Sequence, residues 1–246
     1  MHFPRNIFAT ALVAVCLSSC SSVFQYGPGN LGHESRLLLT PGNKDSLRTA
    51  HNLSGRYTFN LGDGYNPDES CRFGEAYYHL GYSAKYLSCA LGTGLFGGSY
   101  KVRKFTIDPG WKNFFGLNGL GQAAVNLPIG PFNWRILGVR AGFSAEQGAL
   151  YDFRRKYRNT PGFDELTDNR LTFFTGTYSE IMYSKNACQF GISGSNTVMF
   201  ERSGLLGFAA SYCMYAGYKD VNLVYQITGG IRQGQNHSLG VVLMFR

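Results

Sequence analysis

The stretch that decides the fold is HNLSGRYTFNL, residues 51–61, in which apolar and polar side chains alternate. Leu53 and Tyr57 fall on one face of an extended chain, whereas Arg56 and Thr58 fall on the other. Successive side chains of a β-strand point to opposite sides, so a period of two is typical of a strand with one apolar and one polar face. This segment therefore predicts a two-faced strand.

The same alternation recurs along the rest of the chain. Turn-forming residues separate ten segments of this kind, and we expect a strand in each. The segments are 51–61, 74–82, 86–100, 113–127, 133–147, 170–183, 187–196, 204–215, 220–230 and 237–246. Successive strands without helical segments between them predict an all-β fold, an antiparallel up-and-down β-barrel of about ten strands.

Alternation alone fits two arrangements of the faces. A membrane-spanning barrel points its apolar face outward, whereas a soluble β-sandwich or a lipocalin-like barrel, which is the alternative, points it inward. In a membrane barrel the polar side chains expected inside are Arg56, Glu75, His79, Gln122, Asn126, Arg140, Glu180, Asn222 and Gln226. The apolar side chains expected outside are Leu53, Tyr57, Leu80, Leu137, Val139, Leu223, Tyr225, Val241 and Leu243.

Prolines and connections favour the membrane barrel. We expect all eight prolines to lie outside the strands, because proline cannot donate to a hydrogen-bonded ladder. The predicted connections alternate between short turns and longer polar loops, which is the pattern of outer-membrane barrels. An even number of strands places both ends of the barrel on the short-turn side.

Composition agrees with a limited aqueous surface. The 246 residues include 32 glycines, 19 phenylalanines and 16 tyrosines, and 15% are charged, against about 25% in an average soluble domain. The net charge of +8 is not concentrated in a Lys/Arg block, so we expect no nucleic-acid partner. After Cys20 no apolar run is long enough for a transmembrane helix.

The N-terminal segment carries an independent signal. Arg5 precedes the apolar run Ile7–Leu17, which is too short to cross a membrane as a helix and ends in Leu17-Ser18-Ser19-Cys20. This segment resembles the signal peptide and lipobox of bacterial lipoproteins. The resemblance implies that residues 1–19 are removed, that Cys20 becomes the lipidated N-terminus, and that Ser21 is compatible with delivery to the outer membrane.

The C-terminal segment 237–246 resembles the last strand of outer-membrane β-barrel proteins, since apolar residues alternate up to Phe245. It departs from that pattern at Arg246, which leaves the aromatic residue penultimate, and no specific family is identified. We therefore expect a signal peptide at 1–19, a lipidated N-terminus and flexible tether at 20–50 with one short element at 36–40, and a barrel at 51–246.

Motifs of nucleotide-binding or catalytic proteins fail on their context. Gly92–Gly97 spells GxGxxG but continues as a strand where a dinucleotide site needs a helix, and 191–195 lacks the last glycine of a nucleophile elbow. The cysteines after Cys20 have no zinc-site spacing, and they fit one or two disulfides or packed strand positions. We expect no metal and no cofactor. These cysteines are Cys71, Cys89, Cys188 and Cys213.

Two charged groups are candidate sites. We interpret the first as paired charges that fill a narrow lumen, and not as a catalytic set. The second lies in the longest predicted loop, 150–169, and is either a contact for lipopolysaccharide phosphates or another anionic surface, or a solvated loop. The lumen group is Arg56, Glu75, His79, Arg140 and Glu180, and the loop group is Arg154, Arg155, Lys156 and Arg158.

The leading hypothesis is a non-enzymatic outer-membrane β-barrel lipoprotein with a structural, adhesive or narrow-channel role, because side chains fill most of so small a barrel. One alternative is an outer-membrane enzyme that modifies lipid or lipopolysaccharide. The other is a membrane-anchored soluble β-domain that binds a ligand. We expect the protein in the outer membrane of a Gram-negative envelope, anchored through Cys20, with outer-membrane lipids, lipopolysaccharide among them, as partners.

The lipobox yields a direct prediction. Substitution Cys20→Ser removes the thiol that is alkylated, so we expect the variant to incorporate no labelled palmitate during growth. The measurement is metabolic labelling followed by isolation of the protein. Labelling equal to that of the wild type would show that the lipid is attached elsewhere.

Overall fold

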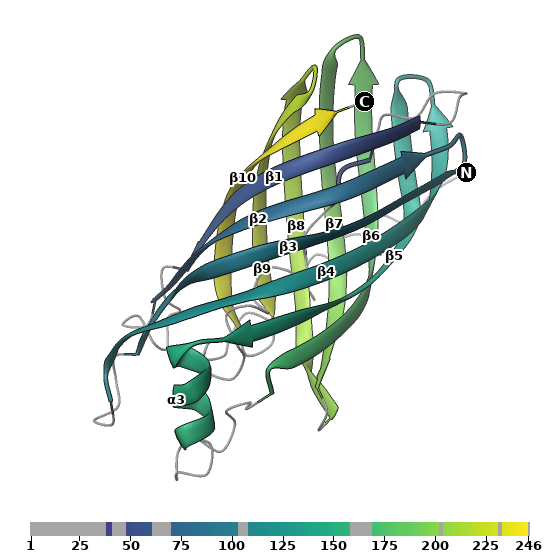
Figure 1. Cartoon of the computed structure of the whole chain (residues 1–246). Coiled ribbons are helices and arrows are strands. Elements are labelled where there is room, and N and C mark those ends of the chain that lie inside the picture. Colours follow the sequence, from purple (N-terminus) through teal and green to yellow (C-terminus); the bar gives the residue numbers. More distant parts are fainter. Residues whose placement is uncertain are drawn as a thin grey trace.

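The protein is a closed barrel of ten antiparallel strands (Figure 1). The structure, a computed structural model, describes residues 38–40, 48–60, 70–102, 108–157, 169–201, 204–230 and 233–245. The strands are β1 (Arg48–Asn60), β2 (Ser70–Ser83), β3 (Leu87–Val102), β4 (Gly110–Ile129), β5 (Phe132–Gln147), β6 (Leu171–Lys185), β7 (Cys188–Glu201), β8 (Gly204–Tyr218), β9 (Val221–Gly230) and β10 (Gln233–Phe245). One helix, α3 (Ala149–Tyr157), follows β5.

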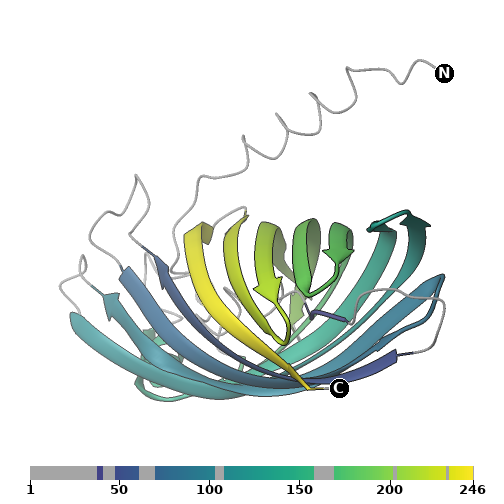
Figure 2. The same ribbon diagram turned by 90° about the horizontal axis from the view of Figure 1, so that it is seen from above.

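Each strand pairs with its neighbours in sequence, and β1 pairs with β10 to complete the ring. This pairing runs from His51 opposite Phe245 to Asn60 opposite Asn236. Seen from above, the early strands sweep around one side of the barrel and the late strands line the other (Figure 2). The predicted up-and-down barrel of ten strands is confirmed, and both Arg48 and Phe245 lie at the end with the short turns.

The faces of the barrel are also as predicted. All nine polar side chains expected inside are buried, and the apolar side chains expected outside are exposed, except that Tyr225 is half-buried. A soluble sandwich or a lipocalin-like barrel requires the opposite arrangement. The alternation of the sequence therefore places polar groups in the lumen and apolar groups on the outer wall.

Aromatic rings share the lumen with these polar groups, and glycines on the adjacent strands make room for them. A Cβ atom added to Gly191 would lie 2.2 Å from the ring of Tyr215, and one added to Gly138 would lie 2.2 Å from the ring of Tyr178. Each of these glycines is the register partner of the residue whose ring covers it. The high glycine content thus reflects, in part, the packing of rings flat against the inner wall.

The prediction that all prolines lie outside the strands is wrong for Pro128, which lies inside β4, opposite Asn133 of β5. On the other side of β4, pairing with β3 ends at Val125, and the Asn126 amide donates to the Tyr86 carbonyl in the turn before β3. Pro128 lies two residues further on, beyond the start of β3. Its missing N–H therefore deprives no strand of a hydrogen bond, which is the position at which proline is tolerated.

Segment 150–169 was predicted as a loop, but its first part is the helix α3. Leu150 and Phe153 are one turn apart and pack, with Tyr157 beside them, on inner-face residues of β2, β3 and β4. Asp152 in the first turn and basic residues in the last turn suit the helix dipole. Of the residues described, none belongs to a helix long and apolar enough to cross a membrane. The inner-face residues are Cys71, Phe73, Phe96, Tyr100, Val102 and Phe114.

Candidate functional site in the barrel lumen

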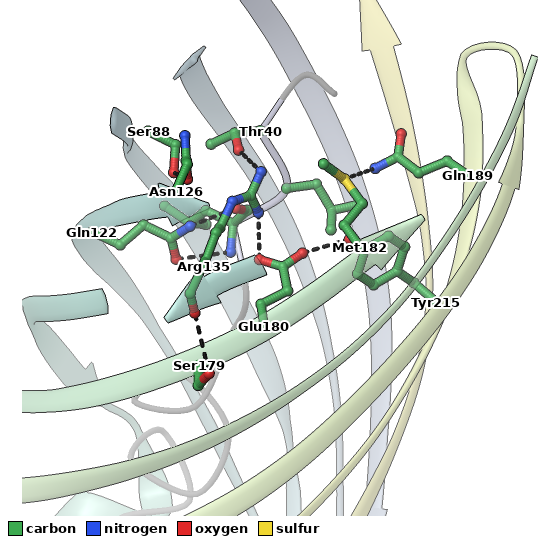
Figure 3. A network of polar contacts seen from close by, with 12 residues as sticks. Thr40, Ser88, Gln122, Asn126, Arg135, Ser179, Glu180, Met182, Gln189 and Tyr215 are labelled. Atoms are coloured by element: carbon green, nitrogen blue, oxygen red, sulfur yellow. Dashed lines mark hydrogen bonds and ion pairs between the residues drawn. The ribbon is translucent and has the colours of Figure 1, made fainter. Parts of the chain in front are cut away.

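A buried ion pair between Arg135 on β5 and Glu180 on β6 lies in the lumen near the short turns (Figure 3). Arg135 donates one hydrogen bond to Glu180 and another to the Thr40 hydroxyl. The Tyr215 hydroxyl donates to the other oxygen of Glu180, at 2.5 Å. Arg135 and Glu180 are almost completely buried, so each charge depends on these partners for the interactions that water would otherwise supply.

A second buried ion pair joins β1 and β2. Arg56 donates to Glu75, and a further N–H of Arg56 donates to the side-chain oxygen of Gln226 on β9, at 3.1 Å. The Asn118 amide on β4 donates to the remaining Glu75 oxygen, at 3.4 Å. The pair therefore links strands on both sides of the ring.

Between these charges, the lumen holds a tripeptide, Leu38-Leu39-Thr40, which lies before β1 in the sequence and is fully buried. Gln122 accepts a hydrogen bond from the Leu38 amide, at 3.2 Å, and donates one to the Leu38 carbonyl, at 2.5 Å. His79 Nε2 donates to the Leu39 carbonyl, at 2.9 Å. We expected these residues in a flexible tether with one short element at 36–40. In the structure residues 38–40 form no helix or strand, and side chains of the wall bind them inside the barrel.

The two leucine side chains fill two different levels of the lumen. Leu39 packs in an apolar cluster close to the short-turn ends of the strands, and Leu38 packs in a cluster deeper inside. The tripeptide therefore occupies the lumen along its axis. The cluster of Leu39 includes Ala50, Met182, Tyr215, Val242 and Met244, and that of Leu38 includes Tyr77, Ala90, Leu120, Phe174, Met199 and Ala209.

The members of the predicted lumen group contact several different partners. Arg56 pairs with Glu75 as expected of a filled lumen, whereas His79 binds the tripeptide. Arg140 is buried as predicted, and Glu180 pairs with Arg135. All five side chains are inside the barrel.

Arg135 was missed because a β-bulge interrupts the alternation of β5. Pairing with β6 shifts register between Arg135 and Gly138, so Ile136 and Leu137 both face outward. Strict alternation counted back from Leu137 would place Arg135 outside the barrel. The two consecutive apolar residues were the available signal, since a bulge lets adjacent side chains share a face.

One member of the predicted basic loop group is not exposed as expected. Arg154 is buried, because α3 turns it toward Glu146, whose carboxylate lies 2.7 Å away. Arg155 and Lys156 are exposed, and Arg158, like the signal peptide and Cys20, lies outside the described residues. Arg154 therefore does not share a surface contact with Arg155 and Lys156.

The remaining motifs show no reactive arrangement in the part of the chain that is described. Gly92–Gly97 is a continuous stretch of β3. Cys71, Cys89, Cys188 and Cys213 are free thiols, the first and last of them buried. Within the described ranges, no group of three His, Cys, Asp or Glu side chains is placed to hold a metal ion.

Comparisons with known proteins show limited similarity. No family model matches the chain, and no curated protein matches it. Neisserial surface protein A is 10% identical over 81% of this chain and 99% of its own, with a TM-score of 0.40. An outer membrane channel from Pseudomonas putida F1 is 10% identical over 89% of this chain and 100% of its own, with a TM-score of 0.42. The translocator domain of the autotransporter NalP from Neisseria meningitidis is 10% identical over 81% of this chain and 88% of its own, with a TM-score of 0.37. The chain resembles these outer-membrane barrels too distantly for a functional argument.

The buried pair on β5 and β6 yields a stability prediction. Arg135→Met leaves the Glu180 carboxylate buried without its cation, so we expect the free energy of unfolding to fall by about 3–5 kcal/mol. The measurement is urea unfolding of the refolded barrel in lipid vesicles, followed by tryptophan fluorescence. The control, Arg155→Met, removes an exposed arginine and should change stability by less than about 0.5 kcal/mol. Equal losses in the two variants would contradict the assigned role of Arg135.

Proposed function

We propose that the protein is a non-enzymatic outer-membrane β-barrel lipoprotein that serves as a closed, lipid-anchored scaffold. The observation that carries this proposal is the filled lumen, in which Leu38-Leu39-Thr40 occupies the space between the wall side chains. The lipobox at Cys20 supports the lipid anchor. At one end of the barrel every connection has two or three residues. At the other end β1–β2, β3–β4 and β5–β6 have longer connections, although β7–β8 and β9–β10, where longer loops were also predicted, are joined by two residues each. The three long connections support an orientation in which they and α3 face the outside of the cell.

The outer wall supports location in a membrane. Each of the ten strands exposes at least one large apolar side chain, so the apolar surface surrounds the barrel. Contiguous apolar surface of this kind is rare on soluble monomers and marks contact with lipid or protein. The closed ladder leaves no unpaired strand edge, and a β-structure that spans a membrane must not have one. Representative side chains from β1 to β10 are Leu53, Leu80, Leu91, Phe115, Leu137, Ile181, Ile192, Met214, Leu223 and Leu239.

The contents of the lumen support a closed barrel. Leu38 and Leu39 are buried in apolar clusters, and hydrogen bonds from Gln122 and His79 hold their backbone. An ion that crossed the barrel would have to displace both the apolar side chains and these hydrogen bonds. We therefore favour a structural scaffold over a narrow channel.

The enzymatic alternative lacks a specific observation in its favour. His79, the histidine of the predicted lumen group, is 1% exposed, and its Nε2 already donates to the Leu39 carbonyl. A lipid substrate would have to replace the tripeptide before it met this side chain. The scaffold proposal predicts no turnover of phospholipid or lipopolysaccharide.

The closed lumen is tested by electrical conductance. In planar lipid bilayers, we expect the wild-type chain to show no stable conductance steps. The double substitution Leu38→Asp/Leu39→Asp places two charges in apolar clusters, so the tripeptide should leave the lumen and steps should appear. The control Leu38→Met/Leu39→Met conserves volume and should stay closed. Steps of the same size in the wild type and the aspartate variant would refute the closed barrel.

A further inference from the structure

Two cations and a tryptophan meet on the outer wall at the long-loop end of the barrel. The Arg72 guanidinium carbon lies 4.5 Å from the centre of the Trp111 ring, and Lys101 Nζ lies 5.7 Å from the same centre. Trp111 is 44% exposed. We call Arg72, Lys101 and Trp111 the Trp111 cluster. Its members come from β2, β3 and β4, which are adjacent strands.

The strand register fixes this arrangement. Lys101 is the register partner of Trp111, and Arg72 is the partner of Ser99, whose hydroxyl accepts a hydrogen bond from Arg72 Nε at 3.4 Å. The neighbours Cys71 and Tyr100 are buried on the inner face, so the alternation of the strands turns the cluster outward. Contacts with the ring hold the two cations in place on the outer wall.

Charges on the cluster are not neutralised by any described residue. Neither Arg72 nor Lys101 forms an ion pair within the described ranges. Asp108, which precedes β4, accepts a hydrogen bond from Lys112 at 2.7 Å, and this bond lowers the pKa of the Asp108 carboxyl. Three buried carboxylates of the barrel, Glu75, Glu146 and Glu180, are paired with arginines. The cluster therefore presents two positive charges that suit an anionic ligand.

An apolar wall continues from the cluster along the same strands. Phe115 is 53% exposed and lies four residues after Trp111 on β4, a distance of about 13 Å at the usual rise of about 3.3 Å per residue. Leu95 on β3 and Leu117 on β4 extend this surface. A ligand that fits both parts carries a phosphate at one end and acyl chains at the other. Aromatic residues at this level are typical of the membrane interface.

We propose that the Trp111 cluster binds the phosphate of a lipopolysaccharide-type glycolipid in the outer leaflet. The two cations hold the phosphate, and the apolar wall of β3 and β4 contacts the acyl chains. This inference rests on the proposed function, because the long loops assign this end of the barrel to the outer leaflet. It moves the anionic contact from the helix α3 to the outer wall of the barrel.

The test follows the fluorescence of Trp111. The chain contains two tryptophans, so Trp134→Phe leaves Trp111 as the reporter in the full-length protein, reconstituted in phosphatidylcholine vesicles. Bisphosphorylated lipid A should change its emission. Arg72→Gln/Lys101→Gln in the same background should weaken the apparent affinity about 30-fold, as expected for two cations at an anionic lipid surface. Added salt should weaken the wild-type response as well.

The controls separate charge, lipid class and folding. Lys85→Gln/Lys185→Gln removes two exposed cations at the short-turn end and should leave the affinity unchanged. Dephosphorylated lipid A and phosphatidylglycerol should bind more weakly than lipid A. Equal affinity of the Arg72→Gln/Lys101→Gln variant, or equal binding of either control lipid, would overturn the inference while the barrel remained inserted. Failure of the wild-type chain to insert into vesicles would instead overturn the proposed function.

Discussion

The constraint on which the structure depends is closure of the backbone hydrogen-bond ladder between β1 and β10. A closed ladder pairs each strand on both sides, which is the condition for a β-structure to exist in lipid. Once the ring is closed, each side chain faces either the lumen or the outer wall, and the alternation of the sequence decides which. The outer wall becomes apolar, so the charged groups on the strands must find partners inside or lie near the ends.

The lumen meets this demand in two ways. Arg56 with Glu75 and Arg135 with Glu180 are buried pairs with further partners on other strands. Arg56 donates to Gln226 on β9, and Glu75 and Glu180 accept hydrogen bonds from Asn118 on β4 and Tyr215 on β8. Aromatic rings and Leu38-Leu39-Thr40 occupy further space in the lumen. A barrel of this size could have kept a narrow aqueous path, but here the chain uses its own N-terminal residues to occupy it. The closed lumen and the apolar outer wall together favour the proposed structural scaffold over a pore.

Sequence reasoning predicted what depends on a period of two: the ten strands, their faces and the short-turn ends. It missed features that break this period or that join distant residues. The bulge after Arg135 reverses the alternation locally, and α3 follows a helical period within a polar segment. The burial of Leu38 depends on Gln122, which is 84 positions away, and no local pattern reports such a contact. Likewise, Trp111 meets Arg72 only because β2 and β4 flank β3.

The most direct test of a closed barrel in lipid compares two adjacent positions of β10. Leu239 faces outward and is 55% exposed, whereas Ser238 faces the lumen and is buried. Spin labels are attached to Leu239→Cys or Ser238→Cys in a variant whose four barrel cysteines are alanine. In vesicles, we expect oxygen but not a water-soluble nickel complex to reach the label at 239, and neither to reach the label at 238. Nickel contact at 239 would show that the outer wall faces water, and nickel contact at 238 would show that the lumen is an open aqueous pore.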